Sequence, residues 1–141
     1  MPEIVGPITS VVDGSYWTST LLSPANSLQL GYGGQAEQFA INMAWPYTYF
    51  CTVRSVNQQR YVQWTADGWI VISDISSSTN WDDISTDIQK TLAFAYSEPY
   101  DGWFRLQVGL ANGNSVTVQS GDPNYLFTGP DQDDFSLFIR P

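Results

Sequence analysis

Histidine is absent from all 141 residues, and Cys51 is the one cysteine. Without histidine there is no Ser-His-Asp or Cys-His nucleophile pair, no imidazole base and little material for a zinc site. Because Cys51 stands alone in the apolar run YFCTV, no intrachain disulfide can form, and a small buried hydrophobe is favoured over a nucleophile. We therefore expect no cofactor.

Positive charge is also scarce. Five Lys and Arg face fourteen Asp and Glu, which gives a formal net charge of −9. The basic residues are scattered along the chain rather than clustered, so no patch is predicted that could bind a phosphate backbone or an anionic membrane surface. Nucleic acid is not an expected partner.

Long apolar runs and targeting signals are missing too. Runs such as WIVI and TLAFAY fall far short of the roughly 20 residues that span a bilayer. The first residues, MPEIVGPITS, lack a basic segment followed by an apolar one, and no Asn-x-Ser/Thr sequon occurs. We expect no membrane insertion and a cytoplasmic location, and secretion by a non-classical route stays open.

Carboxylates are the remaining catalytic material, chiefly Asp82, Asp83, Asp87, Glu98 and Asp101. Two of them, held at the right separation, suffice for glycoside hydrolysis. In a short, turn-rich and acidic chain, however, Asp residues mainly close turns or are solvated, and there is little room for a deep cleft. The sequence predicts a protein that is not an enzyme.

The stretch DQDD, residues 131–134, raises the question of calcium, because hard cations prefer clustered oxygen ligands. It lacks the spacing and the distal Glu of an EF-hand loop, so a solvated turn is favoured and no metal ligand is assigned. Whether calcium binds between Asp131 and Asp134 is left open.

Short β-branched and aromatic segments alternate with Gly, Asn, Asp, Ser and Pro about every ten residues, which is typical of an all-β barrel or sandwich. Only Trp81–Ala95 spaces its apolar residues in a way that a helix could use, and its β-branched residues weaken that interpretation. The predicted strands are Ile8–Val12, Tyr16–Leu22, Ser27–Leu30, Gln38–Met43, Tyr47–Ser55, Tyr61–Thr65, Trp69–Ser73, Thr91–Tyr96, Trp103–Leu110, Ser115–Gln119 and Asp134–Ile139.

The segments DGSYWTS and DGWFRLQ both place an Asp-Gly turn before aromatic residues, which suggests an internal repeat. Three copies of strand, turn, strand, turn and closing aromatic fit within a single domain covering residues 1–141. The predicted repeats are 13–46, 47–100 and 101–141, with an insertion around residues 84–99 of the second. Their closing aromatics are Phe39, Trp81 and Phe135.

These closing aromatics, in EQF, TNW and DDF, stand where ricin-type lectins carry the aromatic of a Gln-x-Trp element, although the spaced Gln is missing here. The chain resembles β-trefoil lectins of the fungal fruiting-body and ricin-B-like type. The resemblance implies a β-trefoil-like barrel of three repeats, in which hairpins cap a short barrel. A β-sandwich or jelly roll is the alternative fold.

Tryptophan and tyrosine are abundant, six and eight residues respectively. Aromatic rings stack on the C–H faces of sugars while Asp and Asn bind the hydroxyls, so rings beyond the needs of the core indicate a carbohydrate site. Strand alternation leaves Trp69 opposite the apolar face of Ile70 and Ile72. Packing in the core remains an alternative role for each ring, and Trp81, Phe39, Phe135 and Phe50 are the predicted core aromatics.

Trefoil lectins build each site from an early turn and a later aromatic and amide of one repeat. Carried over to this sequence, the resemblance implies one site in the second repeat and one in the third. The predicted ligand-binding residues are Asp67, Trp69, Asn80 and Asp82, and then Asp101, Trp103, Asn124 and Tyr125.

The predicted function is that of a lectin without catalytic residues, which recognises a neutral glycan or glycoprotein. Single sites of this kind are weak, so avidity would come from repeated sites or from a homo-oligomer. The alternative is a β-trefoil protease inhibitor that acts through an exposed loop. Its candidate loops are LLSPANS, YSEPYDG and SGDPNYLFTGPDQ, which proline would stiffen.

Overall fold

The structure is a computed structural model that describes residues 3–12, 14–18, 31–32, 36–43, 50–108, 114–119, 125–130 and 136–141. It contains antiparallel strands, the 3-10 turn η2 (Trp81–Asp83) and the helix α1 (Thr86–Leu92). The strands are β1 (Glu3–Gly6), β2 (Thr9–Ser10), β3 (Trp17–Thr18), β4 (Gly31–Tyr32), β5 (Phe39–Asn42), β6 (Phe50–Ser55), β7 (Arg60–Trp64), β8 (Ile70–Ser76), β9 (Ala93–Tyr100), β10 (Trp103–Val108), β11 (Asn114–Gln119), β12 (Tyr125–Gly129) and β13 (Phe138–Ile139).

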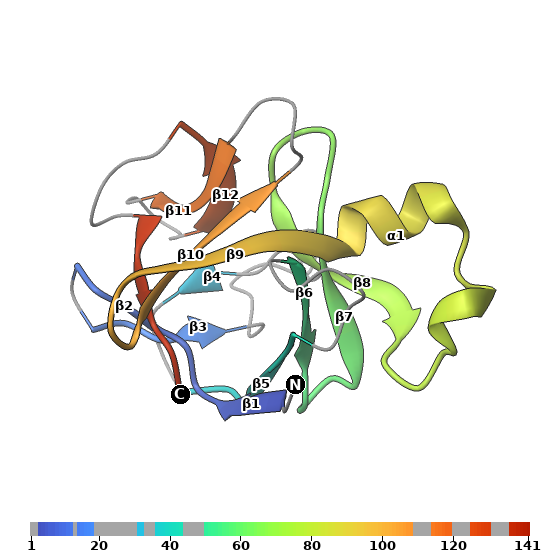
Figure 1. Cartoon of the computed structure of the whole chain (residues 1–141), viewed down its shortest axis with the longest axis horizontal. Helices are drawn as coiled ribbons and strands as arrows, with labels where there is room; N and C mark the ends of the chain where they lie inside the picture. Colours follow the sequence, from blue (N-terminus) through green and yellow to red (C-terminus); the bar gives the residue numbers. More distant parts are fainter. Residues whose placement is uncertain are drawn as a thin grey trace.

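Six antiparallel pairings form the wall of a barrel, in the order β1–β5–β6–β9–β10–β13–β2 (Figure 1). Strands β1 and β2 are not paired with each other, so the ladder of hydrogen bonds is not closed. They are consecutive pieces of the N-terminal segment, separated only by Pro7 and Ile8. The chain itself therefore joins the two ends of the wall.

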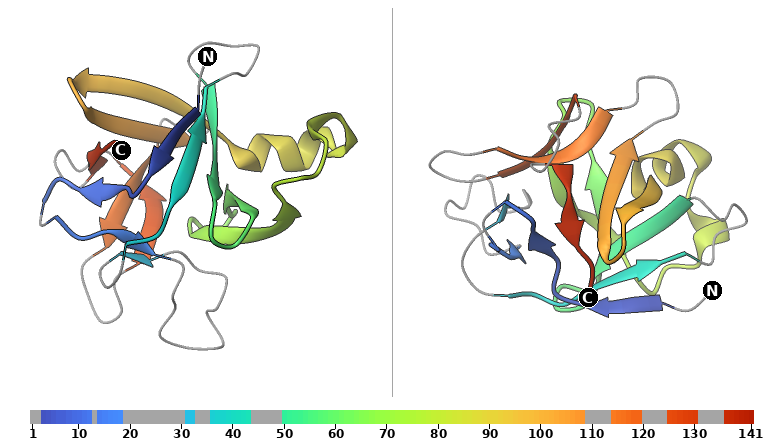
Figure 2. Two further views of the ribbon diagram at one scale, coloured as in Figure 1. Left: turned by 90° about the horizontal axis from the view of Figure 1, so that it is seen from below. Right: turned by 60° about the vertical axis from the view of Figure 1, so that its left-hand side comes forward.

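Three further strand pairs, β3–β4, β7–β8 and β11–β12, form what we term the hairpin cap. The β11–β12 pair contacts the other two: Tyr125 of β12 pairs with Gly31 of β4, and Trp69 forms a bridge to Phe127 of β12. Two further views show these pairs beside the strands of the wall (Figure 2). A barrel with three capping hairpins is the β-trefoil-like arrangement.

The register of the wall shows the threefold relation between its parts. One fully buried phenylalanine in each of β5, β9 and β13 lies opposite an equivalent residue of the preceding wall strand. The pairs are Phe39 with Gly6, Phe94 with Cys51, and Phe138 with Phe104. The fold is thus an all-β, β-trefoil-like barrel of three repeats, as the sequence predicts.

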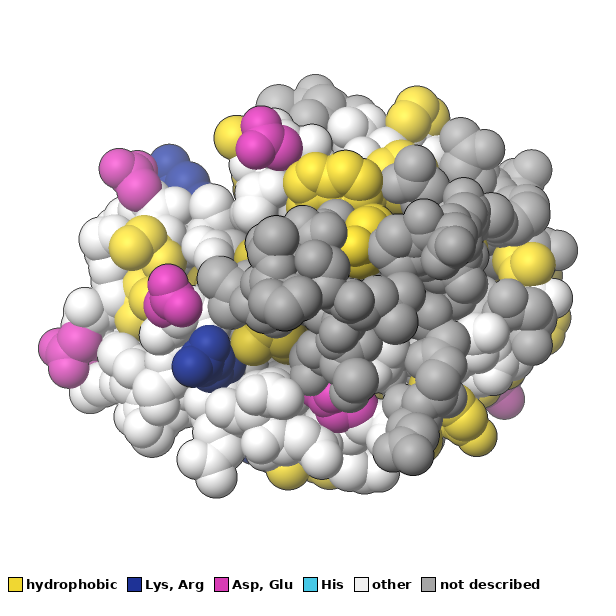
Figure 3. Space-filling model, turned by 180° about the vertical axis from the view of Figure 1, so that it is seen from behind, with side chains coloured by type: hydrophobic (Ala, Val, Ile, Leu, Met, Phe, Trp, Pro, Cys, Tyr) yellow, Lys and Arg dark blue, Asp and Glu magenta, His cyan; other side chains and the backbone are white. Residues whose placement is uncertain are grey.

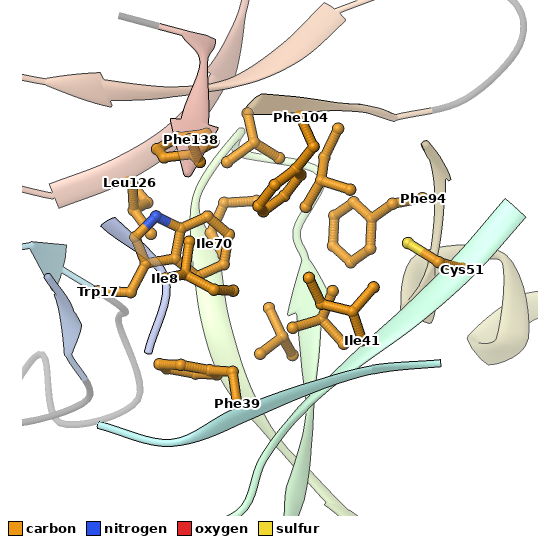
Figure 4. Packing of buried hydrophobic residues seen from close by; sticks show 14 of the residues in the cluster. Ile8, Trp17, Phe39, Ile41, Cys51, Ile70, Phe94, Phe104, Leu126 and Phe138 are labelled. Carbon is orange, nitrogen blue, oxygen red and sulfur yellow. The ribbon is translucent and has the colours of Figure 1, made fainter. Parts of the chain in front are cut away.

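The core fills the barrel with large aliphatic and aromatic side chains (Figure 4). The Trp17 ring packs edge-on against Phe39, at a centroid distance of 5.8 Å, and against Phe138, at 5.0 Å. Cys51 is completely buried, and burial raises the pKa of its thiol to about 12. The thiol therefore stays protonated and packs as a small apolar group, in agreement with its apolar sequence context.

Two of the predicted core aromatics differ from expectation. Phe39 is fully buried, but Phe50 and Trp81 are only half-buried, and Phe135 lies outside the described residues. Trp81 belongs to a small cluster under α1, with Tyr61, Ile84 and Leu92, because the chain leaves the barrel after β8 and returns only at β9. Phe94, rather than Trp81, occupies the closing core position of the second repeat.

The segment expected to be weakly helical, Trp81–Ala95, is helical in part. Ser85 caps α1 by accepting a hydrogen bond from the Ile88 N–H, and the helix ends at Leu92. From Ala93 the chain is extended, because Phe94 and Tyr96 pair with the wall strands β6 and β10. Tertiary pairing thus overrides the helical spacing of the last residues of this segment.

Most predicted strands exist, with shifted ends. The structure adds β1, β4 and β12, which the sequence did not indicate. In the described part of the last predicted strand, Asp134–Ile139, the strand residues are Phe138 and Ile139. One predicted strand, Ser27–Leu30, lies outside the described residues.

One face of the molecule carries carboxylates spread among uncharged polar side chains rather than gathered in one cluster (Figure 3). Among the described residues, no helix is both long and apolar enough to cross a membrane.

Candidate functional site

The hairpin between β9 and β10 ends in a tight turn that presents two aromatic rings. Tyr100 pairs with Trp103, which leaves Asp101 and Gly102 as the turn residues. Gly102 has φ +81°, a left-handed conformation that glycine adopts without steric cost. Pro99 precedes the turn where the register of the two strands shifts, a position that tolerates its missing N–H.

The Tyr100 and Trp103 rings meet edge-on at a centroid distance of 5.7 Å and an interplanar angle of 72°. Both are exposed, at 60% and 36% respectively, and Asp101 between them is exposed as well. The sequence predicted Asp101 and Trp103 as ligand-binding residues but missed Tyr100. The Asp-Gly turn could have indicated Tyr100, because the two residues that flank a two-residue turn face each other across a hairpin.

The exposed rings continue across the barrel wall. Trp103 pairs with Ile139 of β13, Ile139 pairs with Thr9 of β2, and Thr9 forms a bridge to Tyr16. Their sequence neighbours Phe104, Phe138, Ser10 and Trp17 are all buried, so alternation directs the row itself outward. We call Tyr100, Trp103, Ile139, Thr9 and Tyr16 the outer row.

The outer row follows the outside of the barrel wall and is partly apolar. Ile139 and Tyr16 are each 38% exposed. With neighbouring strands roughly 4.8 Å apart, four steps between the five positions give a row about 19 Å long. Such a surface offers ring faces at both ends and an exposed carboxylate, Asp101, at one of them.

A hydrogen bond and an ion pair to Glu98 hold the wall behind the outer row. The Glu98 carboxylate accepts a hydrogen bond from the Tyr96 hydroxyl at 2.5 Å and pairs with Arg140 Nε at 2.9 Å. Burial and this bond to a carboxylate raise the pKa of Tyr96. The backbone N–H of Arg140, the residue after β13, donates to the Gly102 carbonyl at 2.9 Å and fixes the hairpin turn in place.

Trp69 follows a second Asp-Gly turn, in the β7–β8 hairpin, but its surroundings differ. Gly68 has φ +93°, and its carbonyl accepts the Thr128 N–H of β12 at 2.6 Å. The half-buried Trp69 ring meets the half-buried Tyr125 ring at 5.7 Å and 74°. The structure thus joins a residue predicted for the site of the second repeat to one predicted for the third, inside the hairpin cap.

The other two predicted residues of the second repeat lie elsewhere. Asn80 caps η2 by accepting a hydrogen bond from the Asp82 N–H at 3.2 Å, and both side chains are exposed. Trp81 between them packs on Tyr61, near the end of β7 that pairs with Ser76. Asp67 and Trp69 lie beyond the opposite end of β8, whose seven residues extend over about 20 Å. The structure does not bring these two pairs together.

The predicted residues of the third repeat are also divided. Asp101 and Trp103 belong to the outer row, whereas Tyr125 contacts Trp69 in the cap. Asn124 lies outside the described residues, as do Asp131–Asp134. Within the described ranges, no group of three or more Cys, Asp or Glu side chains could hold a metal ion.

A polar hollow of about 550 Å³, which the sequence did not indicate, opens on the outer face of β1, β5 and β6. Its side chains come from segments far apart in the sequence, so no local pattern could have revealed it. The lining residues are Glu3, Asn42, Thr52, Arg54, Val56, Gln59, Tyr61, Ser76, Ser77 and Ser78.

One segment considered for protease inhibition has a different structure from the expected loop. Residues 96–102, YSEPYDG, form the end of β9 and the two-residue turn, and are paired with β10. LLSPANS and much of SGDPNYLFTGPDQ lie outside the described residues.

No protein-family model matches this sequence, and no curated protein sequence matches it. Solved structures do match. A lectin from Polyporus squamosus, bound to the epitope Neu5Acα2-6Galβ1-4GlcNAc, aligns with 99% of this chain at a TM-score of 0.71 and 12% identity. This chain spans about half of that lectin, 49% of its length.

Two further solved structures match over nearly their whole length. SeviL, bound to asialo-GM1 saccharide, aligns at a TM-score of 0.65 and 13% identity, with 99% of this chain and 98% of SeviL covered. ThreeFoil, a designed threefold symmetric protein, aligns at a TM-score of 0.65 and 12% identity, with 96% of each chain covered. At such low identity these matches show the fold, which is that of β-trefoil proteins that include glycan-binding lectins.

Proposed function

We propose that this protein is a carbohydrate-binding protein without catalytic activity, which recognises a neutral glycan on the outer row. The observation that carries the proposal is the row itself. Three exposed aromatic rings, Tyr100, Trp103 and Tyr16, lie along one line of cross-strand neighbours, with the Asp101 carboxylate at one end.

The chemistry of the row suits a sugar. Ring faces pack against the C–H faces of a pyranose, and a carboxylate accepts hydrogen bonds from its hydroxyl groups. A chain with a net charge of −9 repels anionic ligands at long range but leaves the approach of a neutral one unchanged. An open row of about 19 Å, counted from strand to strand, favours a glycan of several units over a single terminal sugar.

Shallow sites of this kind are weak when they act alone. We expect millimolar to micromolar dissociation constants, which correspond to about −4 to −8 kcal/mol. Repeated sites on a glycoprotein, or a homo-oligomer of this chain, would raise the effective affinity without any new contact. The lectins that share the fold support the assignment to glycan binding.

A glycan array tests the proposal, with Trp103→Ala and Trp103→Phe beside the unchanged protein. We expect binding to linear neutral glycans that Trp103→Ala removes and Trp103→Phe partly keeps, because a smaller ring still stacks. Ile88→Ala is the matched control, since Ile88 on α1 is 37% exposed, like Trp103, but lies outside the row. An array without any bound glycan, or a Trp103→Ala protein that binds normally, contradicts the proposal.

A further inference from the structure

The floor of the polar hollow is one row of cross-strand neighbours. Glu3 of β1 pairs with Asn42 of β5, and Asn42 pairs with Thr52 of β6. The neighbours Ile41, Cys51 and Val53 point into the core, so alternation turns the polar side chains outward. The wall strands thus present a carboxylate, an amide and a hydroxyl side by side.

An ion pair stands over this floor. Arg54 pairs across the strands with Tyr61, and its Nε and Nη2 both donate to Glu3 Oε2, at 3.2 and 2.7 Å. Within the described part of the chain, these bonds leave Arg54 Nη1 as a donor and Glu3 Oε1 as an acceptor. Because the two charges cancel, the hollow offers both kinds of hydrogen-bonding group without a net charge.

The far side of the hollow contains the one strained backbone position among the described residues other than glycine. Gln59 has φ +56°, a conformation that side chains rarely adopt. Hydrogen bonds hold it there: its N–H donates to the Ser55 carbonyl, and the Ser77 N–H donates to the Gln59 carbonyl, both at 2.9 Å. Strain of this kind gathers at ligand sites, and here it accompanies an amide side chain that lines the hollow.

We propose that the polar hollow is a second binding site, for a neutral, hydroxyl-rich ligand the size of one or two sugar units. Nine of its ten lining residues are polar or charged, and Tyr61 is too buried to offer its ring face. The ligand is therefore held by hydrogen bonds to amides, hydroxyls and the Arg54–Glu3 pair, not by stacking. The volume of about 550 Å³ is in the range of small-molecule sites.

This inference rests on the proposed function only for its class of ligand, because the hollow and the outer row share no residue. A chain with both sites would engage a glycan through two chemically different contacts. Stacking on the row would select an extended chain, and hydrogen bonding in the hollow would select the stereochemistry of a short terminal unit.

The test is titration of the 15N-labelled protein with methyl glycosides of glucose, galactose, mannose and N-acetylglucosamine, and with lactose and cellobiose, at millimolar concentration. We expect saturable NMR shifts of the Gln59, Ser77 and Ser78 amides with at least one of these probes. Gln59→Gly should weaken that binding at least several-fold while keeping the fold, because glycine favours this φ. Gln59→Asn keeps an amide and tolerates the same φ, so it should restore part of the affinity.

Shifts that stay linear, the absence of shifts with every probe, or unchanged binding by a folded Gln59→Gly protein would each overturn the second site. Trp103→Ala separates this inference from the proposed function. We expect it to leave the shifts in the hollow unchanged while it removes binding on the array. Saturable shifts in the hollow, together with array binding that Trp103→Ala leaves unchanged, would mean that the outer row is not a binding site while the second site stands.

Discussion

Two pairs of aromatic rings in this molecule have almost the same geometry and different surroundings. Tyr100 and Trp103 meet at 5.7 Å and 72°, and Trp69 and Tyr125 meet at 5.7 Å and 74°. Both tryptophans follow an Asp-Gly turn. The first pair is exposed at a hairpin tip, whereas the second is half-buried where β12 crosses the β7–β8 turn. Neighbouring strands, not local geometry, decide which rings are available to a ligand.

The largest difference should be in stability. Trp69→Ala removes a ring that packs between two hairpins, so we expect the free energy of unfolding to fall by about 2–3 kcal/mol, less than for a fully buried ring. Trp103→Ala should lower it by less than about 1 kcal/mol. Urea denaturation followed by circular dichroism measures both, and equal losses would remove the distinction between the two pairs.

Glycan affinity should show the reverse order, with Trp103→Ala causing the larger loss and Trp69→Ala the smaller. Trp103→Ala removes the central ring of the outer row, and we expect glycan affinity to fall at least about tenfold, or about 1.4 kcal/mol. Trp69→Ala should change affinity less than about twofold once the folded fraction is corrected for. Isothermal titration calorimetry with an array-positive glycan provides the measurement. Greater loss in the Trp69→Ala protein would transfer the site to the hairpin cap.

Substitution of the turn glycines Gly68 and Gly102 distinguishes the effect of backbone strain on stability from an effect on glycan binding. Gly68→Ala and Gly102→Ala both place a side chain at positive φ, and in neither case does the added Cβ meet an atom closer than 3.4 Å. We expect each to lower stability by about 1 kcal/mol. Only Gly102→Ala should also weaken glycan binding, because its turn sets the spacing of Tyr100 and Trp103. Similar binding by both variants would show that the turn does not position the rings.

The smallest effect concerns the reach of the outer row. Tyr16→Ala should reduce affinity for a linear glycan of several units by about threefold, or about 0.7 kcal/mol, and leave affinity for its single sugar unit unchanged. Titration with a length series of the same glycan measures this. A loss that is independent of length would place Tyr16 outside the contact surface.

The sequence predicted the fold class because alternation and turn residues act locally. Ile70 and Ile72 are buried, as the alternation of their strand indicates. The sequence was a poor guide to equivalent positions in the repeats, because one local signal, the Asp-Gly turn, occurs in several structural contexts. Its Asp-Gly turns at Gly14, Gly68 and Gly102 all have positive φ, yet they join β2 to β3, β7 to β8 and β9 to β10. They mark tight turns in general, so they are poor markers of equivalent positions in a repeat.

The site was predictable only in part, because its rows depend on long-range pairing. Asp101 and Trp103 could be named from the turn that contains them. That Tyr16 and Ile139 share their row follows from the pairing of β13 with both β10 and β2, which no local pattern specifies. The polar hollow is the extreme case, since Glu3 and Arg54 are 51 residues apart in the chain.

The junction between β1 and β2 has a consequence for the design of permuted chains. New termini placed at Pro7 and Ile8 would break no ladder hydrogen bond, but they would remove the covalent link that holds the two end strands of the wall, β1 and β2, together and so expose their unpaired edges. Unprotected edges recruit strands from other molecules. Termini introduced at this junction should therefore favour self-association, whereas a break in an exposed turn elsewhere leaves this link intact.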